Sequence, residues 1–269
     1  MTSPWTPGAD RASGRGSGSG RGDCPAGLGG WFRTPLGSRA AAAEADELRD
    51  IVPGLFGYHL VQVGSGPEAD ILDGSPALHR VVIGQPGDDG PGPWGLVASA
   101  EALPLRSDSV DALVLCHALD LAADPHRVLR EAERVLVGEG QLVIVGFNPR
   151  SVWGAVRWLR RGRDLPWCAR FMAPGRVRDW LRLLGFEILQ ERRRVFVPPV
   201  QGAALQRRMA RLEGWGRRWV PSLGAVYVLV ARKHTLTLTP VKPRWRPRRA
   251  LVPGLADPAS RVPVDAVDP

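Results

Sequence analysis

The stretch that follows residue 103 constrains the fold most, because it predicts a strand, a helix and a second strand with a signal at the helix start. Residues 111–115 form a largely apolar run, which is typical of a strand covered on both faces. Asp124 suits the N-cap of the following helix, and Pro125 suits its first turn. Residues 141–147 form a second apolar run. Strands that alternate with helices in this way predict an α/β fold built on a mostly parallel sheet.

Similar patterns extend this organisation in both directions along the chain. Short apolar runs predict further strands, and apolar residues at helical spacing predict further helices. In such a fold, ligands bind at the carboxyl ends of the strands, so the loops that follow the strands are the candidate sites. The expected strands are residues 59–63, 80–83, 95–97, 187–197 and 225–231, and the expected helices are residues 40–51, 176–184 and 206–219.

Both ends of the chain differ in composition from its middle. Residues 1–37 are rich in Gly, Ser, Pro and Arg, and residues 235–269 are rich in Pro, with a basic cluster around Trp245. Neither segment has enough apolar residues to offset the entropy lost on ordering, so we expect two disordered tails. We therefore expect a single domain over residues 38–234.

Charge is unevenly distributed along a chain whose formal net charge is +9. Residues 38–149 are acidic overall, whereas residues 150–219 are rich in Arg. This asymmetry predicts either a surface for an anionic partner such as nucleic acid, or attraction between two parts of one globule. The basic Pro-rich tail likewise predicts either a solvated segment or a contact with nucleic acid or anionic lipid.

The cysteine pattern and the hydropathy argue against several classes of protein. The three cysteines, Cys24, Cys116 and Cys168, are too few and too scattered for a disulfide framework. No apolar run has the length of a membrane-spanning helix, and the N-terminus lacks the apolar region of a secretory signal. No cluster of candidate ligands predicts a metal site. These features predict a cytoplasmic protein without a membrane span.

Gly64-Ser65-Gly66 follows the expected strand at residues 59–63 and is the first candidate for a binding loop. Glycines at this place let the backbone turn tightly and approach a ligand closely. The third glycine of a dinucleotide-binding fingerprint is absent, and Gln85 follows the second strand where that fingerprint has an acidic residue. From these residues alone, a cofactor-binding loop and an ordinary tight turn explain the pattern equally well.

A longer pattern lies between residues 99 and 149. Its parts resemble the methyltransferase type 11 group of the class I S-adenosylmethionine-dependent methyltransferases. The resemblance implies a Rossmann-like, seven-stranded, mostly parallel sheet with helices on both faces, and S-adenosylmethionine as the cofactor. The parts that carry it are Ser99-Ala100-Glu101-Ala102-Leu103-Pro104, Val110-Asp111, Leu129-Arg130-Glu131, Arg134-Val135-Leu136 and the turn Gly138-Glu139-Gly140.

The resemblance also implies roles for the loops that follow the first and the second expected strand. Gly64, Ser65 and Gly66 would approach the methionine part of the cofactor. Gln85 would lie near the ribose hydroxyls, at a position where the family has an acidic residue.

The later loops receive roles in the same way. Ser99 stands where the family's usual Asp contacts the adenine amino group, and the backbone of Ala100 would border the adenine. Cys116 and His117 would line the pocket after the fourth strand. Ser99 is thus a second departure from the family's acidic pattern.

His117 and Asn148 are the candidate catalytic residues. Methyl transfer from a sulfonium depends mainly on in-line positioning, and a base is needed only where the acceptor must lose a proton. His117 would supply such a base, and the amide of Asn148 would orient an acceptor. A packing role for His117 and an Asn-Pro turn at Asn148 are the alternative interpretations.

Several tryptophans and arginines occur together in residues 150–170. Such residues stack on aromatic ligands and hold phosphate, which predicts a cover over the substrate. Val152, Val156 and Leu159 recur at helical spacing, which predicts instead an amphipathic helix that packs through these three residues.

Taken together, these features predict a methyltransferase that transfers a methyl group from S-adenosylmethionine to a small or medium-sized acceptor. One alternative is a non-catalytic relative that keeps the fold for binding or regulation and has lost the cofactor. Another is an RNA-binding protein that uses its Arg-rich segment, whose binding would depend steeply on salt.

Overall fold

A computed structural model of the protein describes residues 27–64, 66, 69–86, 96–160, 164–196, 199 and 223–234. They contain a seven-stranded sheet of order β3-β2-β1-β4-β5-β7-β6, in which β7 alone runs antiparallel to the other strands. The predicted Rossmann-like, mostly parallel sheet is confirmed. The strands are β1 (His59–Val63), β2 (His79–Gly84), β3 (Leu96–Val97), β4 (Val110–Cys116), β5 (Leu136–Phe147), β6 (Phe186–Arg194) and β7 (Val226–Lys233).

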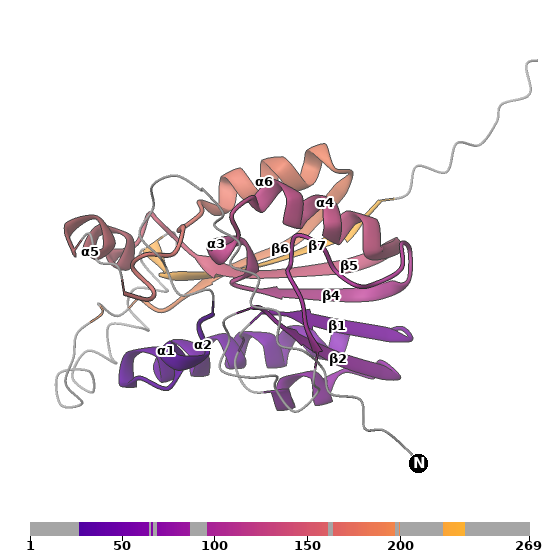
Figure 1. Cartoon of the computed structure of the whole chain (residues 1–269), viewed down its shortest axis with the longest axis horizontal. Coiled ribbons are helices and arrows are strands. Elements are labelled where there is room, and N and C mark those ends of the chain that lie inside the picture. The colour runs from indigo at the N-terminus through magenta and orange to yellow at the C-terminus, as the bar shows by residue number, and fades with distance from the viewer. Residues whose placement is uncertain are drawn as a thin grey trace, which may run out of the picture. The chain divides into compact units, whose positions relative to one another are not determined.

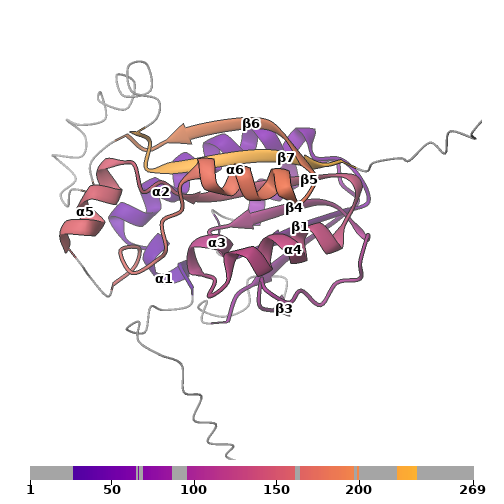
Figure 2. The same ribbon diagram turned by 90° about the horizontal axis from the view of Figure 1, so that it is seen from above.

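Helices cover both faces of the sheet, as Figures 1 and 2 show. Helix α2 packs on one face, whereas α4 and α6 pack on the other. Strand β4 serves both cores, because its successive side chains point to opposite faces. The helices are α1 (Gly29–Phe32), α2 (Pro35–Ile51), α3 (Ala118–Leu121), α4 (Pro125–Val135), α5 (Val152–Arg160) and α6 (Pro174–Leu183), with 3₁₀ helices at Val52–Gly54 and Ala69–Gly74.

Helix α4 begins where the sequence predicts. The carboxylate of Asp124 accepts hydrogen bonds from the backbone N–H groups of His126 and Arg127, and Pro125 occupies the first turn. The helix ends at Val135, and β5 follows at once at Leu136 rather than at the expected residue 141. The earlier start reflects an added pairing between Leu136 and Val110 of β4, beyond an irregularity in the ladder.

The N-terminal boundary differs from the sequence prediction. Residues 27–37 were expected to be disordered, yet they contain α1 and the start of α2. Leu28 is fully buried and Trp31 is nearly so, and these two anchors compensate for the low apolar content around them. Thr34 caps α2, since its hydroxyl accepts a hydrogen bond from the N–H of Gly37. The remainder of both expected tails, and the expected helix at residues 206–219, lie outside the described residues.

Helix α5 packs on the core through Trp153 and Val156, so only Val156 of the three residues expected to pack does so. Trp153 is only 1% exposed, whereas Leu159 is 77% exposed and Val152 is 38% exposed. The indole of Trp153 stacks near the ring of Phe147 at the end of β5. Burial of one large aromatic side chain outweighs burial of two smaller aliphatic ones, so the helix is rotated toward Trp153.

The Arg-rich strand β6 is joined to the acidic helix α2. Glu47 of α2 is buried and forms ion pairs with Arg192 and Arg194 of β6. Arg192 also pairs with Asp50 at 3.2 Å. For these residues, the charge asymmetry of the sequence corresponds to attraction between two parts of one globule.

Two further observations concern the cysteines and the hydropathy of the helices. Cys116 is a buried free thiol, whereas Cys168 is disulfide-bonded, which the scattered cysteines did not lead us to expect. Within the described part of the chain, no helix combines the length and apolar character needed to cross a membrane.

Candidate functional site

The loop after β1 packs directly against the end of β4. Gly64 has a φ of +93°, and a Cβ added to it would lie 2.3 Å from the backbone O of Cys116 and 3.0 Å from Nε2 of Gln85. Both the backbone angle and this close approach require glycine. The carboxyl ends of β1, β2 and β4 therefore meet at Gly64.

Gly66 makes a second close approach to the same strand. A Cβ there would lie 2.8 Å from Sγ of Cys116 and 2.8 Å from Nε2 of Gln62. Burial raises the pKa of the Cys116 thiol well above its ordinary value, with a smaller contribution from the charge of Glu44. The thiol therefore stays protonated, so Cys116 packs against the loop and does not act as a nucleophile. Ser65 lies outside the described residues.

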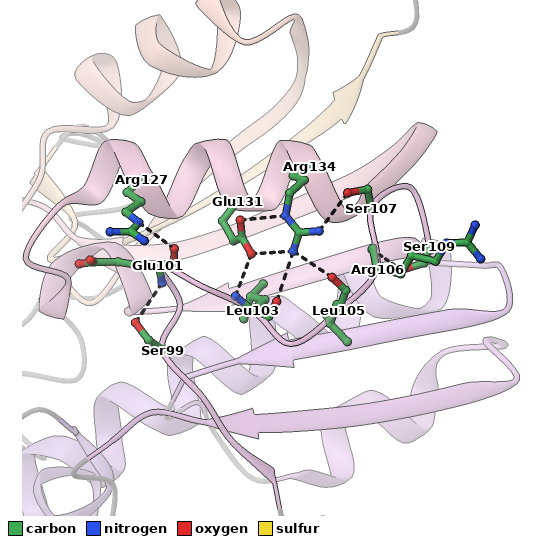
Figure 3. Close-up of polar contacts among 10 residues, drawn as sticks. All are labelled: Ser99, Glu101, Leu103, Leu105, Arg106, Ser107, Ser109, Arg127, Glu131 and Arg134. Atoms are coloured by element: carbon green, nitrogen blue, oxygen red, sulfur yellow. Dashed lines mark hydrogen bonds and ion pairs between the residues drawn. The ribbon is translucent and has the colours of Figure 1, made fainter.

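The loop after β3 carries the two expected adenine contacts. Ala100 is buried in the core beneath α4, whereas the side chain of Ser99 is exposed. The hydroxyl of Ser99 accepts a hydrogen bond from the N–H of Glu101. Glu101 is in turn tied to α4, because Arg127 donates to its backbone O (Figure 3). Its carboxylate also accepts a hydrogen bond from the N–H of Asp124, the N-cap of that helix.

The remainder of this loop is held by a pair of charged residues on α4. Glu131 accepts a hydrogen bond from the N–H of Leu103, and Arg134 pairs with Glu131 at 2.6 Å. Arg134 also donates to the backbone O atoms of Leu103 and Leu105 and to the hydroxyl of Ser107 (Figure 3). The family-like Glu131 and Arg134 thus position the loop from outside the site.

Asp111 performs a similar task at the opposite end of the sheet. Its carboxylate accepts hydrogen bonds at 2.9 Å from the N–H groups of both Tyr58 and His59, and so fixes the start of β1 against β4. Gly57 permits this contact, because a Cβ there would lie 2.4 Å from the Asp111 side chain. The family-like Val110-Asp111 pair is therefore a structural element rather than a ligand contact.

His117 is fully buried beside the glycine loop, in a left-handed backbone conformation with φ of +51°. Its Nδ1 lies 2.9 Å from Oδ2 of Asp120, and its Nε2 lies 3.1 Å from Oε1 of Glu44. Because carboxylates only accept hydrogen bonds, this environment favours an imidazolium that donates from both nitrogens. The backbone N–H of Phe147 also donates to Oδ2 of Asp120.

The electrostatics of His117 agree with this geometry. Burial alone would lower the pKa of the imidazole, but the carboxylates of Glu44 and Asp120 outweigh burial and raise it to about 9. Burial raises the pKa of Asp120, against the opposing effects of His117 and the N–H of Phe147. A protonated imidazole with both nitrogens engaged is unsuited to the role of general base that the sequence suggested for it.

Asn148 is also engaged by the protein itself. It is 1% exposed, its Nδ2 donates to the backbone O of Gly224, and its Oδ1 accepts from the N–H of Arg150. These bonds correspond to the turn interpretation of Asn148. The geometry gives no support to a contact between its amide and an acceptor.

Glu44 is the residue of this region that the sequence analysis missed. It lies on α2, 73 positions before His117, and its side chain is fully buried. A signal was present, because Glu44 occupies a place in the buried stripe that also contains Ala40, Leu48 and Ile51. A carboxylate at such a position requires a buried partner.

Comparisons with known proteins agree with this architecture. A family model described as a methyltransferase domain matches residues 72–144. The uncharacterized protein YafS of Escherichia coli strain K12 is 34% identical over 216 residues, which are 79% of this chain and 84% of that protein.

Solved structures share the fold at lower sequence identity. One is an S-adenosylmethionine-dependent methyltransferase of Thermotoga maritima, described as a possible histamine N-methyltransferase, with a TM-score of 0.55 and 20% identity over 76% of this chain and 92% of that one. Another belongs to a complex of the Haloferax volcanii Trm112 methyltransferase activator with a methyltransferase candidate, with a TM-score of 0.56 and 17% identity over 79% of this chain and 98% of that one. With its seven-stranded sheet and its glycine loop at the end of β1, the chain belongs to the class I S-adenosylmethionine-dependent methyltransferases, in the type 11 group.

Proposed function

We propose that the protein binds S-adenosylmethionine at the carboxyl edge of its sheet and transfers the methyl group to a small or medium-sized acceptor. One observation carries the proposal: Gly64, Gly66, Gln85 and Cys116 converge where the strand order reverses between β1 and β4. Ligands of doubly wound sheets bind at this reversal.

The described residues suit the cofactor. Gly64 and Gly66 let the loop turn tightly against Cys116, at the edge of the sheet where the methionine part would lie, and Gln85 offers an amide to the ribose hydroxyls. Ser99 offers a hydroxyl to the adenine, with Ala100 along its edge. The cofactor would supply an already activated methyl group on a sulfonium.

The remaining task of the chain is to orient the acceptor in line with that methyl group. His117 and Asn148 are engaged in internal hydrogen bonds, so we assign the proton-transfer role to neither. The proposal therefore favours an acceptor atom that is already nucleophilic at neutral pH.

The neutral residues Gln85 and Ser99 predict a weaker cofactor affinity than two carboxylates would provide. A hydrogen bond to a charged group contributes about 1.5–3 kcal/mol, against about 0.5–1.5 kcal/mol between neutral groups. The loss of about 1 kcal/mol at each position corresponds to roughly a fivefold weaker affinity per position.

Calorimetric titration with S-adenosylmethionine and S-adenosylhomocysteine tests the proposal. We expect micromolar dissociation constants for the wild-type protein and loss of binding in Gly66→Asp, because that side chain would enter the loop beside Cys116. Gly54→Asp is the matched control, since a Cβ at this exposed glycine meets nothing within 4 Å. Absence of binding by the wild-type protein up to millimolar ligand would contradict the proposal and favour the non-catalytic alternative.

A further inference from the structure

The Glu44–His117–Asp120 cluster joins three elements that meet at the carboxyl edge of the sheet. Glu44 comes from α2, His117 follows β4, and Asp120 lies in α3. Oδ2 of Asp120 also accepts a hydrogen bond from the N–H of Phe147, which ends β5. One imidazole therefore connects a helix on one face of the sheet with the ends of two central strands.

The cluster acts on the backbone that faces the glycine loop. His117 directly follows Cys116, whose backbone O and Sγ form the close approaches to Gly64 and Gly66. A left-handed conformation is uncommon for a residue other than glycine and costs about 1–2 kcal/mol, so the surroundings must hold it in place. The N–H of His117 donates to the backbone O of Val145, and its backbone O accepts from the N–H groups of Asp120 and Leu121. Its two ring nitrogens add two further anchors, which come from side chains.

The buried negative charge of Glu44 depends on His117 for a compensating positive charge. The side chain is fully buried, and its second oxygen, Oε2, has no hydrogen-bond partner among the described residues. Oδ1 of Asp120 is in the same situation. A buried carboxylate without a counter-charge is strongly unfavourable, so Glu44 favours the charged imidazole and the position of the residue that carries it.

We propose that Glu44 is a positioning residue for the cofactor site: by holding the charged ring of His117, it fixes Cys116 against Gly64 and Gly66. The proposal rests on the proposed cofactor binding for its functional consequence, but its structural part can be tested without the cofactor. It assigns to α2 a direct influence on a loop that its own residues do not form.

The charged and titratable groups around His117 come from four elements. Glu44 on α2 and Asp120 on α3 contact the ring, and Cys116 on β4 directly precedes His117. Tyr227 on β7 interacts electrostatically with Asp120. Burial raises the pKa of both the Cys116 thiol and the Tyr227 hydroxyl above their ordinary values. Neither group therefore titrates between pH 6 and 8, and a change in that range in a Glu44 variant reports on the hydrogen-bonded pair of His117 and Asp120.

Glu44→Gln is the decisive variant, because its amide fills the same space and still accepts a hydrogen bond but carries no charge. We expect His117 to lose its proton between pH 6 and 8 in the variant and to keep it in the wild-type protein. The affinity for S-adenosylmethionine should then match the wild type near pH 6 and fall about tenfold by pH 8, whereas the wild-type affinity stays constant over this range. Asp46→Asn is the matched control, since Asp46 lies on the same helix with its side chain 75% exposed.

A cofactor-free readout separates this inference from the proposed function. We expect the amide NMR signals of Gly64 and Gly66 in Glu44→Gln to shift with the same midpoint as the imidazole of His117. If the variant does not fold, the wild-type signals should shift together with His117 near pH 9. Glycine signals that stay constant while His117 titrates would overturn the inference, as would a Glu44→Gln affinity with the wild-type pH profile. If the signals shift but the wild-type protein binds no cofactor, the inference about positioning stands and the proposed function fails.

Discussion

Arg134→Met tests whether the charged pair on α4 holds the loop after β3. The substitution keeps most of the aliphatic stem but removes the hydrogen bonds to the backbone O atoms of Leu103 and Leu105 and to the hydroxyl of Ser107 (Figure 3). It also leaves Glu131, whose side chain is 15% exposed, without its cation.

The expected loss in the free energy of unfolding follows from these contacts and from the exposure of the Arg134 side chain. The Arg134 side chain is 36% exposed, so each of its three bonds to the loop contributes at the low end of the usual range, about 0.5–1 kcal/mol. We expect the free energy of unfolding to fall by about 2 kcal/mol, and the melting temperature by about 4–8 °C. Urea denaturation followed by circular dichroism measures the first quantity, and calorimetry measures the second.

Arg130→Met is the matched control on the same helix. The Arg130 side chain is 64% exposed, and its ion pair with Asp124 spans 3.9 Å, so we expect a loss below about 0.5 kcal/mol in the free energy of unfolding. Equal losses in the two variants would refute the reasoning, because the loop contacts would then contribute nothing beyond an exposed charge. The same loop carries Ser99, so Arg134→Met should also weaken cofactor binding, whereas Arg130→Met should not.

Three further predictions follow from buried groups. The free energy of unfolding should fall by about 3 kcal/mol as the pH rises from 6.5 through 9, because the native His117 keeps a proton that the unfolded chain releases. Urea denaturation at several pH values measures this dependence, and a rise in stability over the same range would contradict the prediction. Asn148→Ala should cost about 1–3 kcal/mol in the same assay, since the backbone O of Gly224 loses its buried donor. Trp153→Ala should cost about 3–5 kcal/mol, whereas Trp158→Ala, at a residue that is 74% exposed, should cost far less; similar losses would contradict the observed face of α5.

Much of the fold could be predicted because its signals are local. The cap at Asp124 and Pro125 lies within a few residues of the helix it starts, and the β4 run is apolar because both of its faces are covered. The order of α1 could not be predicted in this way. Leu28 and Trp31 are ordered by contacts with residues far away in the sequence, such as the ring of Phe147 against Trp31.

The residues of the candidate site also fall into two groups, those with a local sequence signal and those that depend on residues far away in the sequence. Gly64 was predicted because a turn directly after a strand has a sequence signature, and its positive φ agrees with that signature. The roles expected of His117 depended on its neighbours in space. Glu44, its partner, lies 73 positions away, and a carboxylate on an otherwise apolar helix face does not identify its own counter-charge.

The residues that resemble the family most are those that hold the framework of the site. Asp111 fixes the start of β1, and Glu131 with Arg134 fixes the loop after β3, and each does so through backbone groups. Such contacts depend on the geometry of the fold and not on the ligand. Gln85 and Ser99, which would contact the cofactor itself, are the positions where this chain departs from the family. We therefore expect a difference in cofactor affinity between this chain and the family to arise at these two positions.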